Sequence, residues 1–190
     1  MERALTYLLA TALALGVAAE ACAQGAATQS SSAQQKLEER LNREVRHELV
    51  MLPQLTIFDN LAYKVDGDTV TLYGQVQNAV IKDWAESAVK KIEGVAKVNN
   101  QIEILPPSAN DDRIRHQVAN ALFRDNRLFP YFWGALPSVR IIVKGGHVTL
   151  EGVVNNETDK NEAFIKANGV AGVFSVQNNL RVENSAQSQK

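Results

Sequence analysis

The side chains of this sequence that could carry acid–base or metal chemistry are few and widely spaced. The three histidines, His47, His116 and His147, are not spaced from one another or from a carboxylate as zinc ligands are. The acid pair Asp111-Asp112 begins a helical pattern, where carboxylates interact favourably with the helix dipole. We interpret the histidines as surface residues and the acids as helix-start residues. The sequence predicts no catalytic residue, no metal site, no cofactor and no enzyme.

Motifs for nucleophilic catalysis or phosphate binding are missing from the sequence. It contains no GxSxG, no P-loop and no GxGxxG, and Gly145-Gly146 is not followed by the helix start that a phosphate cradle needs. Two asparagine pairs recur, Asn99-Asn100 and Asn178-Asn179. We expect these asparagines to bond neighbouring backbone rather than a ligand, as asparagines in strands usually do.

The first 23 residues are typical of a secretory signal peptide, with an early base, a short apolar run and small residues before the cleavage site. Cleavage after Ala21-Cys22-Ala23 would leave Gln24 as the first residue of a periplasmic protein. The alternative is cleavage before Cys22, the only cysteine, which would acylate it and make an outer-membrane lipoprotein. Ala19 and Glu20 fit that alternative poorly.

Charge argues against a nucleic acid partner. The signal peptide holds one base and two acids of the 20 basic and 21 acidic residues, so the mature chain is neutral. Phosphate neutralisation supplies much of the affinity for nucleic acid, and this chain has no basic run to supply it. Residues 24–34 and 184–190 have no hydrophobic pattern, and we expect them to be disordered.

The remaining sequence is an internal repeat. GDTVTLYGQV (67–76) matches GGHVTLEGVV (145–154) at an offset of 78, and GVAKVNNQIEI (94–104) matches GVFSVQNNLRV (172–182) at the same offset. The helical patterns upstream match at an offset of 73. The second copy therefore holds a five-residue insertion, which falls in FPYFWGALP (129–137).

Each copy predicts the same order of elements. Apolar residues recur every fourth position over 37–49 and alternate over 61–65 and 70–76, with a turn at Asp66-Gly67. A helical face follows at 84–92 and a last strand at 95–104. The fold class is α+β: two tandem α-β-β-α-β modules, each a three-stranded mixed sheet packed against two helices. Gly74 and Gly152 inside their strands indicate close packing or a bulge, and Asn110-Asp111 is expected to cap the next helix.

This order and its motifs resemble the BON domain (bacterial OsmY and nodulation). The resemblance rests on VTLYGQV (70–76) and VTLEGVV (148–154), and on the Gly-Val-x-x-Val-x-Asn strands that begin at Gly94 and Gly172. It covers residues 35–105 and 111–183, joined by the linker 106–110. The glycines Gly74, Gly94, Gly152 and Gly172 are then structural. Membership implies an envelope location, with phospholipid binding and a role in envelope integrity or osmotic stress tolerance, or periplasmic quality control.

FPYFWGALP is the candidate contact segment, because a loop broken by two prolines and a glycine carries four aromatic residues. One interpretation is a lid on the core, for which Phe129 and Phe132 have the spacing. The other is a membrane contact, in which Tyr131 and Trp133 lie among lipid headgroups. Three nearby bases would attract an anionic leaflet, and against Asp125 they leave a local charge of +2: Arg124, Arg127 and Arg140.

Two function hypotheses follow from these residues and the resemblance. The first is an envelope protein that binds anionic phospholipid membrane surfaces. The second is a soluble periplasmic chaperone or protein-interaction module that binds envelope proteins.

Overall fold

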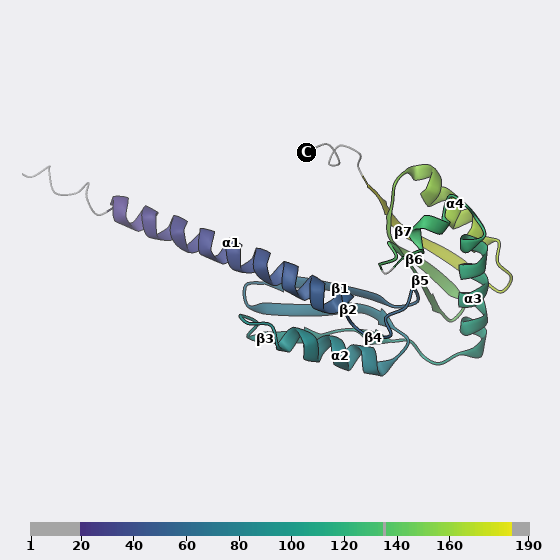
Figure 1. The fold of residues 1–190 in the computed structure, drawn as a ribbon, viewed down its shortest axis with the longest axis horizontal. Helices are drawn as coiled ribbons and strands as arrows, with labels where there is room; N and C mark the ends of the chain where they lie inside the picture. Colours follow the sequence, from purple (N-terminus) through teal and green to yellow (C-terminus); the bar gives the residue numbers. More distant parts are fainter. Residues whose placement is uncertain (1–19, 135, 184–190) are drawn as a thin grey trace, which may run out of the picture.

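The computed structural model describes residues 20–134 and 136–183, with side chains from residue 34 onward. Two α-β-β-α-β modules follow one another along the chain (Figure 1), as the repeat predicts. The predicted signal peptide lies mostly on residues 1–19, and the predicted disordered tail on 184–190, both outside the described residues. None of the described helices combines the length and the apolar character needed to cross a bilayer.

The first module packs two helices on a mixed sheet. Strand β1 pairs antiparallel with β2, and β2 pairs in parallel with β3 and β4. The predicted third strand is interrupted at Gln101 and Ile102, although the Gln101 amide still donates to Leu72 O at 2.7 Å. Its elements are α1 (Glu20–Val50), β1 (Asn60–Asp66), β2 (Thr69–Val76), α2 (Ala79–Lys90), β3 (Lys97–Asn100) and β4 (Glu103–Ile104).

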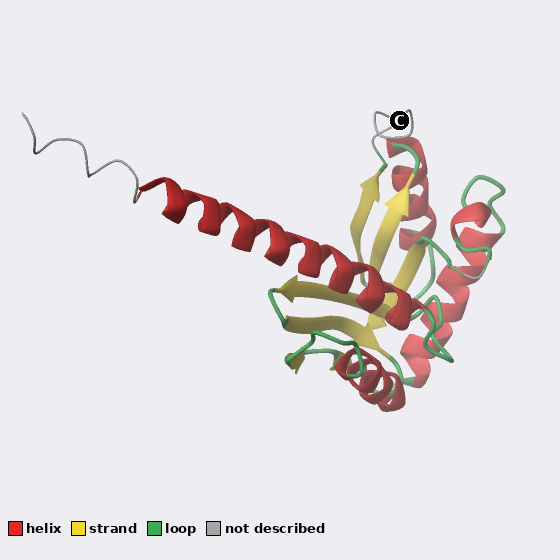
Figure 2. Cartoon of the chain, turned by 60° about the vertical axis from the view of Figure 1, so that its left-hand side comes forward, coloured by secondary structure: helices red, strands yellow, loops and turns green. Residues whose placement is uncertain are grey.

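The second module repeats this arrangement with a continuous third strand. Its sheet has the order β5-β6-β7, antiparallel and then parallel, and Figure 2 shows both of its helices on the same side of the strands. A short 3₁₀ helix occupies the predicted insertion. The elements are α3 (Ala109–Phe123), η1 (Phe129–Tyr131), β5 (Val139–Lys144), β6 (His147–Val154), α4 (Glu157–Asn168) and β7 (Ser175–Val182).

Gly74 and Gly152 occupy matching positions where the neighbouring strand passes too close for a side chain. Their φ angles are +121° and +130°, a region that residues with a Cβ rarely adopt. A Cβ at Gly74 would lie 2.0 Å from Asn60 O, and one at Gly152 would lie 2.0 Å from Ser138 O. The close packing predicted from the sequence is therefore contact with the adjacent backbone.

Helix boundaries differ from the sequence predictions at two places. Helix α1 begins at Glu20, so it includes residues 24–34, for which composition predicts disorder. That stretch is rich in Ala and Gln, which sustain a helix once the following turns are packed. In Figure 1 this end of α1 extends away from both modules.

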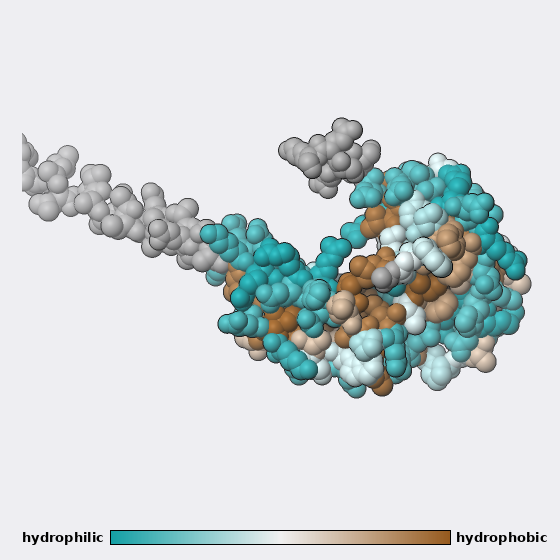
Figure 3. All heavy atoms as spheres, viewed as in Figure 1, coloured by the Kyte–Doolittle hydropathy of each residue, from teal (hydrophilic) through white to brown (hydrophobic). Residues whose placement is uncertain are grey.

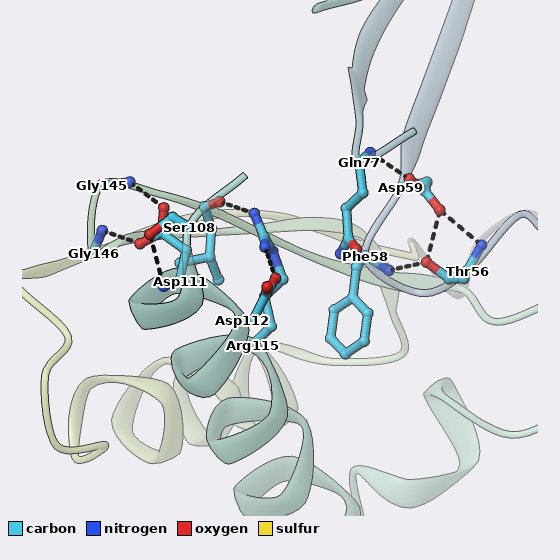
Figure 4. A network of polar contacts seen from close by, with 11 residues as sticks. Thr56, Phe58, Asp59, Gln77, Ser108, Asp111, Asp112, Arg115, Gly145 and Gly146 are labelled. Carbon is cyan, nitrogen blue, oxygen red and sulfur yellow. Dashed lines mark hydrogen bonds and ion pairs between the residues drawn. The ribbon is translucent and has the colours of Figure 1, made fainter. Parts of the chain in front are cut away.

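Helix α3 is capped by Ser108 rather than by the predicted Asn110-Asp111. Ser108 Oγ accepts a hydrogen bond from the Asp111 amide at 3.2 Å. The buried Asp111 carboxylate instead accepts hydrogen bonds from the amides of Gly145 and Gly146, each at 2.8 Å (Figure 4). Asp111 therefore fixes the β5–β6 turn to the first turn of α3.

The two modules are docked through the loop that joins α1 to β1. Ile57 O accepts a hydrogen bond from the Ile141 amide at 2.8 Å, which adds the loop to the edge of β5. Ile57 and Phe58 pack against the core of the second module, and the Phe58 ring meets His116 edge-on with centroids 5.8 Å apart. On the far side of the contact, Lys144 pairs with Glu103.

Candidate functional site

The aromatic segment divides into buried and exposed residues. Tyr131 and Phe132 are each only 7% exposed and belong to the core of the second module. Trp133 is 72% exposed, and Phe129, 39% exposed, stacks on it with centroids 5.3 Å apart. The prediction that Tyr131 projects outward is wrong, and so is the placement of Phe129 in the lid; the lid interpretation is correct for Phe132. The exposed pair is Phe129 and Trp133.

The Tyr131 side chain can be buried because its hydroxyl has hydrogen-bond partners within the second module. It donates to Asp159 Oδ2 at 2.5 Å and accepts from the Asn155 amide at 3.1 Å. Burial, and then the hydrogen bond to Asp159, raises the pKa of the Tyr131 hydroxyl. The Tyr131–Asp159 bond therefore holds the turn that carries Phe129 and Trp133 against the first turn of α4.

The three predicted arginines have different surroundings. Arg124 caps the end of α3 and is exposed. Arg127 pairs with Asp159 at 2.8 Å, with 56% of its side chain exposed. Arg140 is half-buried, and its Nη1 donates to Thr56 O at 3.1 Å across the contact between the modules. Burial lowers the pKa of the Arg140 guanidinium, and nearby Asp59 partly opposes that effect.

A cleft of about 340 Å³ lies where the two modules meet. The loop after α1 forms one wall and the segment after η1 forms the other. We call it the interdomain cleft; it is lined by Val50, Leu52, Gln54, Leu55, Thr56, Ile57, Phe132, Gly134, Leu136, Pro137 and Arg140. Figure 3 shows hydrophobic residues gathered on this side of the molecule between the two modules.

Exposed apolar side chains occur on the chain segments that form this cleft. Leu136 lines it and is 59% exposed. Met51 and Trp133, 66% and 72% exposed, are sequence neighbours of lining residues on the two walls. We call Met51, Phe129, Trp133 and Leu136 the apolar rim. Such a cluster of exposed apolar groups marks a surface for a membrane or another molecule.

Two of the recurring asparagines, Asn100 and Asn178, bond to backbone, whereas Asn179 bonds to the side chains of Glu151 and Gln177. Asn100 Nδ2 donates to Lys82 O at 3.1 Å, and its Oδ1 accepts from the Ile102 amide at 3.2 Å. Asn178 makes the matching pair of bonds, to Lys160 O at 2.8 Å and from the Leu180 amide at 3.2 Å. Asn100 and Asn178 therefore each tie the last strand of their module to the second helix.

No three His, Cys, Asp or Glu side chains within the described part of the chain are grouped as metal ligands. The acids at the start of α3 have structural partners: Asp111 binds the hairpin turn, and Asp112 pairs with buried Arg115 at 2.5 Å. Arg115 also donates to Val143 O at 2.7 Å (Figure 4). His147 Nδ1 lies 2.7 Å from Ser175 Oγ at the start of β7.

Sequence reasoning missed three residues of this region. Met51 follows a helix end and shows no periodic pattern that marks it as exposed. Asp159 is one of several acids at a helix start, and Tyr131 lies 28 positions away from it. Gln54 carries the only positive φ, +64°, among the described residues other than glycine. Its place in the interdomain cleft becomes visible only when the modules are docked.

Two similar α-β-β-α-β modules in one chain define a tandem α+β repeat protein. The chain belongs to the BON domain family, whose model matches residues 33–106 and again residues 110–184. DolP, an outer membrane lipoprotein of Haemophilus influenzae, is 31% identical over 112 residues, which are 56% of this chain and 54% of that protein. The chain thus spans about half the length of that curated relative.

Solved structures of CdsD, a structural protein of the type III secretion system of Chlamydia trachomatis, are also similar. One is 12% identical at a TM-score of 0.31 and covers 77% of this chain and 95% of its own. The CdsD C-terminal domain is 11% identical at a TM-score of 0.26, with 75% and 96% covered. At these TM-scores the similarity supports no conclusion about the fold or function of this protein.

Proposed function

We propose that this chain is a non-enzymatic protein of the bacterial envelope that binds the surface of anionic phospholipid membranes through the apolar rim. The observation that carries the proposal is Trp133, which is 72% exposed and stacked on Phe129, a few residues after Arg124 and Arg127 in the chain. An indole ring suits the boundary between headgroups and acyl chains, because it is apolar with one polar group.

Charge supports the choice of an anionic leaflet. Arg124 is exposed, and Arg127 keeps more than half of its side chain in solvent although it pairs with Asp159. A basic residue near an anionic membrane contributes about 1 kcal/mol to binding, so these two arginines add about 2 kcal/mol at most. Charge alone therefore gives weaker binding than a single acyl chain, whose association constant of about 10⁴ M⁻¹ corresponds to about 5.5 kcal/mol, and insertion of the Trp133 side chain must supply the remainder.

Membership of the BON family and similarity to an outer membrane lipoprotein support the envelope location. Export by the predicted signal peptide would bring the chain to the periplasm. Acylation of Cys22, if it occurs, would make α1 a spacer between the membrane and the modules. By this account the protein supports envelope integrity under osmotic or related stress by attaching to the membrane surface.

Liposome flotation with purified protein tests the proposal. Trp133→Ala is expected to lower the bound fraction on anionic vesicles, because burying one large apolar side chain is worth about 1.5–3 kcal/mol, a tenfold to hundredfold change in partitioning. Phe174→Ala is the matched control. Phe174 is 73% exposed but packs against Gly146, at the opposite end of β5 from the rim.

The two variants separate the possible outcomes. A loss confined to Trp133→Ala supports the rim as the membrane contact. Equal losses in both variants would show that any exposed aromatic contributes, which contradicts a specific rim. A protein that suppresses aggregation of an unfolded client but does not float would contradict the membrane function and favour the chaperone hypothesis.

A further inference from the structure

Arg140 is a partly buried cation without a carboxylate partner. Its one hydrogen bond within the described residues goes to Thr56 O, and it makes no ion pair among them. Asp59, the nearest acid that affects it, has its oxygens occupied by Thr56 and the Gln77 amide (Figure 4). By contrast, buried Arg115 is paired with Asp112. The charge of Asp59 offsets part of the burial of Arg140 without bonding to it, so the guanidinium, with one hydrogen bond to Thr56 O, keeps N–H donors for an anion.

The residues around Arg140 indicate the kind of molecule that would carry this anion. Among the described residues that line the interdomain cleft, Arg140 alone is charged, and Gln54 and Thr56 add polar groups beside it. Gln54 holds its left-handed backbone conformation there, which is unfavourable for a residue with a Cβ. The volume of about 340 Å³ lies in the range of small-ligand sites. Leu136, a residue of the apolar rim, is also part of the lining.

A guanidinium presents several N–H donors in one plane, which match the oxygens of a phosphate better than an ammonium does. An anion with no apolar part would leave Leu136 and its neighbours in water. A molecule with a phosphate and acyl chains satisfies both parts of the site at once.

We propose that the interdomain cleft binds the headgroup of one anionic phospholipid, with the phosphate on Arg140 and the first part of the acyl chains against the apolar rim. The inference rests on the proposed function, because it names the part of the membrane that the protein recognises. It goes further in requiring both modules, since Arg140 comes from the second and Gln54 and Thr56 from the first.

The test is calorimetric titration of the full-length protein with monomeric dihexanoyl phosphatidylglycerol. Saturable binding with one lipid per chain is expected. Dihexanoyl phosphatidylcholine, whose headgroup carries a compensating cation, and inorganic phosphate are each expected to bind at least tenfold more weakly. If phosphate binds as tightly as the lipid, the site is one for free anions and the proposal is wrong.

Two variants with matched controls locate the site. Arg140→Gln is expected to weaken lipid binding at least tenfold, whereas Arg181→Gln removes the same charge from an exposed position on β7 outside the cleft and is expected to change it less than twofold. Equal effects would show diffuse attraction and overturn the proposal. Leu136→Asp places a negative charge at the cleft without touching the Arg140–Thr56 contact. It is expected to weaken binding at least tenfold, against less than twofold for Ile165→Asp, an equally exposed position on α4.

Failure of this inference differs from failure of the proposed function. A protein that floats with anionic vesicles but shows no saturable binding of the short-chain lipid has the membrane function and lacks the headgroup site. A protein whose Leu136→Asp and Ile165→Asp variants bind the lipid alike also lacks it. A protein that does not float lacks the proposed membrane function, whatever the calorimetry shows.

Discussion

Asp159 holds the aromatic turn in place, and replacing it by Ala should destabilise the second module. Its carboxylate is 6% exposed and accepts hydrogen bonds from three side chains: the Tyr131 hydroxyl at 2.5 Å, Arg127 at 2.8 Å and Asn156 at 2.9 Å. The substitution leaves the buried Tyr131 hydroxyl proton without an acceptor. It also removes the hydrogen bond that holds Tyr131, the residue before Phe132, against the first turn of α4.

The expected loss follows from these contacts. An unsatisfied buried hydroxyl costs about 1–3 kcal/mol. The bonds from Asn156 and from Arg127, whose side chain is 56% exposed and screened by water, add about 1 kcal/mol together. The free energy of unfolding should therefore fall by about 2–4 kcal/mol. For a module of this size that corresponds to roughly 10–30 °C in the melting temperature.

Scanning calorimetry of the full-length protein measures this change, and Glu157→Ala is the matched control. Glu157 lies in the same first turn of α4 but is exposed, so its loss should cost less than about 0.5 kcal/mol. If Asp159→Ala melts within about 0.5 kcal/mol of the control, the Tyr131–Asp159 bond does not stabilise the turn. The account of why Tyr131 is buried would then be wrong.

Three other predictions concern stability and processing. Gly152→Ala should lower the free energy of unfolding by about 2–5 kcal/mol, because the new Cβ would lie 2.0 Å from Ser138 O. Gly145→Ala has open space around it and should cost only about 1–2 kcal/mol, which comes from its positive φ. Equal losses for the two variants in urea unfolding would contradict the close contact at Gly152. Burial and Asp159 raise the pKa of Tyr131, so its contribution is complete below the unfolded value of about 10 and is lost as pH rises through the folded pKa. Alkaline unfolding should thus be less steep in Tyr131→Phe, and identical pH profiles would refute this. Mass spectrometry of the exported protein should find Gln24 at the N-terminus, and a diacylglyceryl group on Cys22 would show the lipoprotein alternative instead.

The repeat made most of the fold predictable. An offset of 78 between two strand pairs places equivalent residues in register, so the roles of Gly74 and Gly152 and of Asn100 and Asn178 could be inferred from one chain. These positions depend on local backbone geometry, which the same short motif reproduces in both modules.

The candidate site was only partly predictable, because it depends on contacts between distant elements. Tyr131 was expected at the surface since its ring is amphipathic, and only the fold shows that Asp159 meets its hydroxyl. Arg140 could be noted for its charge, but its burial results from docking against Thr56, 84 positions earlier in the chain. Periodicity describes one element at a time and carries no information about such pairs.

Flotation of the purified protein with vesicles tests the central claim most directly. We expect binding to phosphatidylglycerol vesicles, little binding to phosphatidylcholine vesicles, and loss of the difference as salt screens the arginines. A correctly folded protein that stays at the bottom of the gradient with both kinds of vesicle would contradict the claim that this chain binds membrane surfaces.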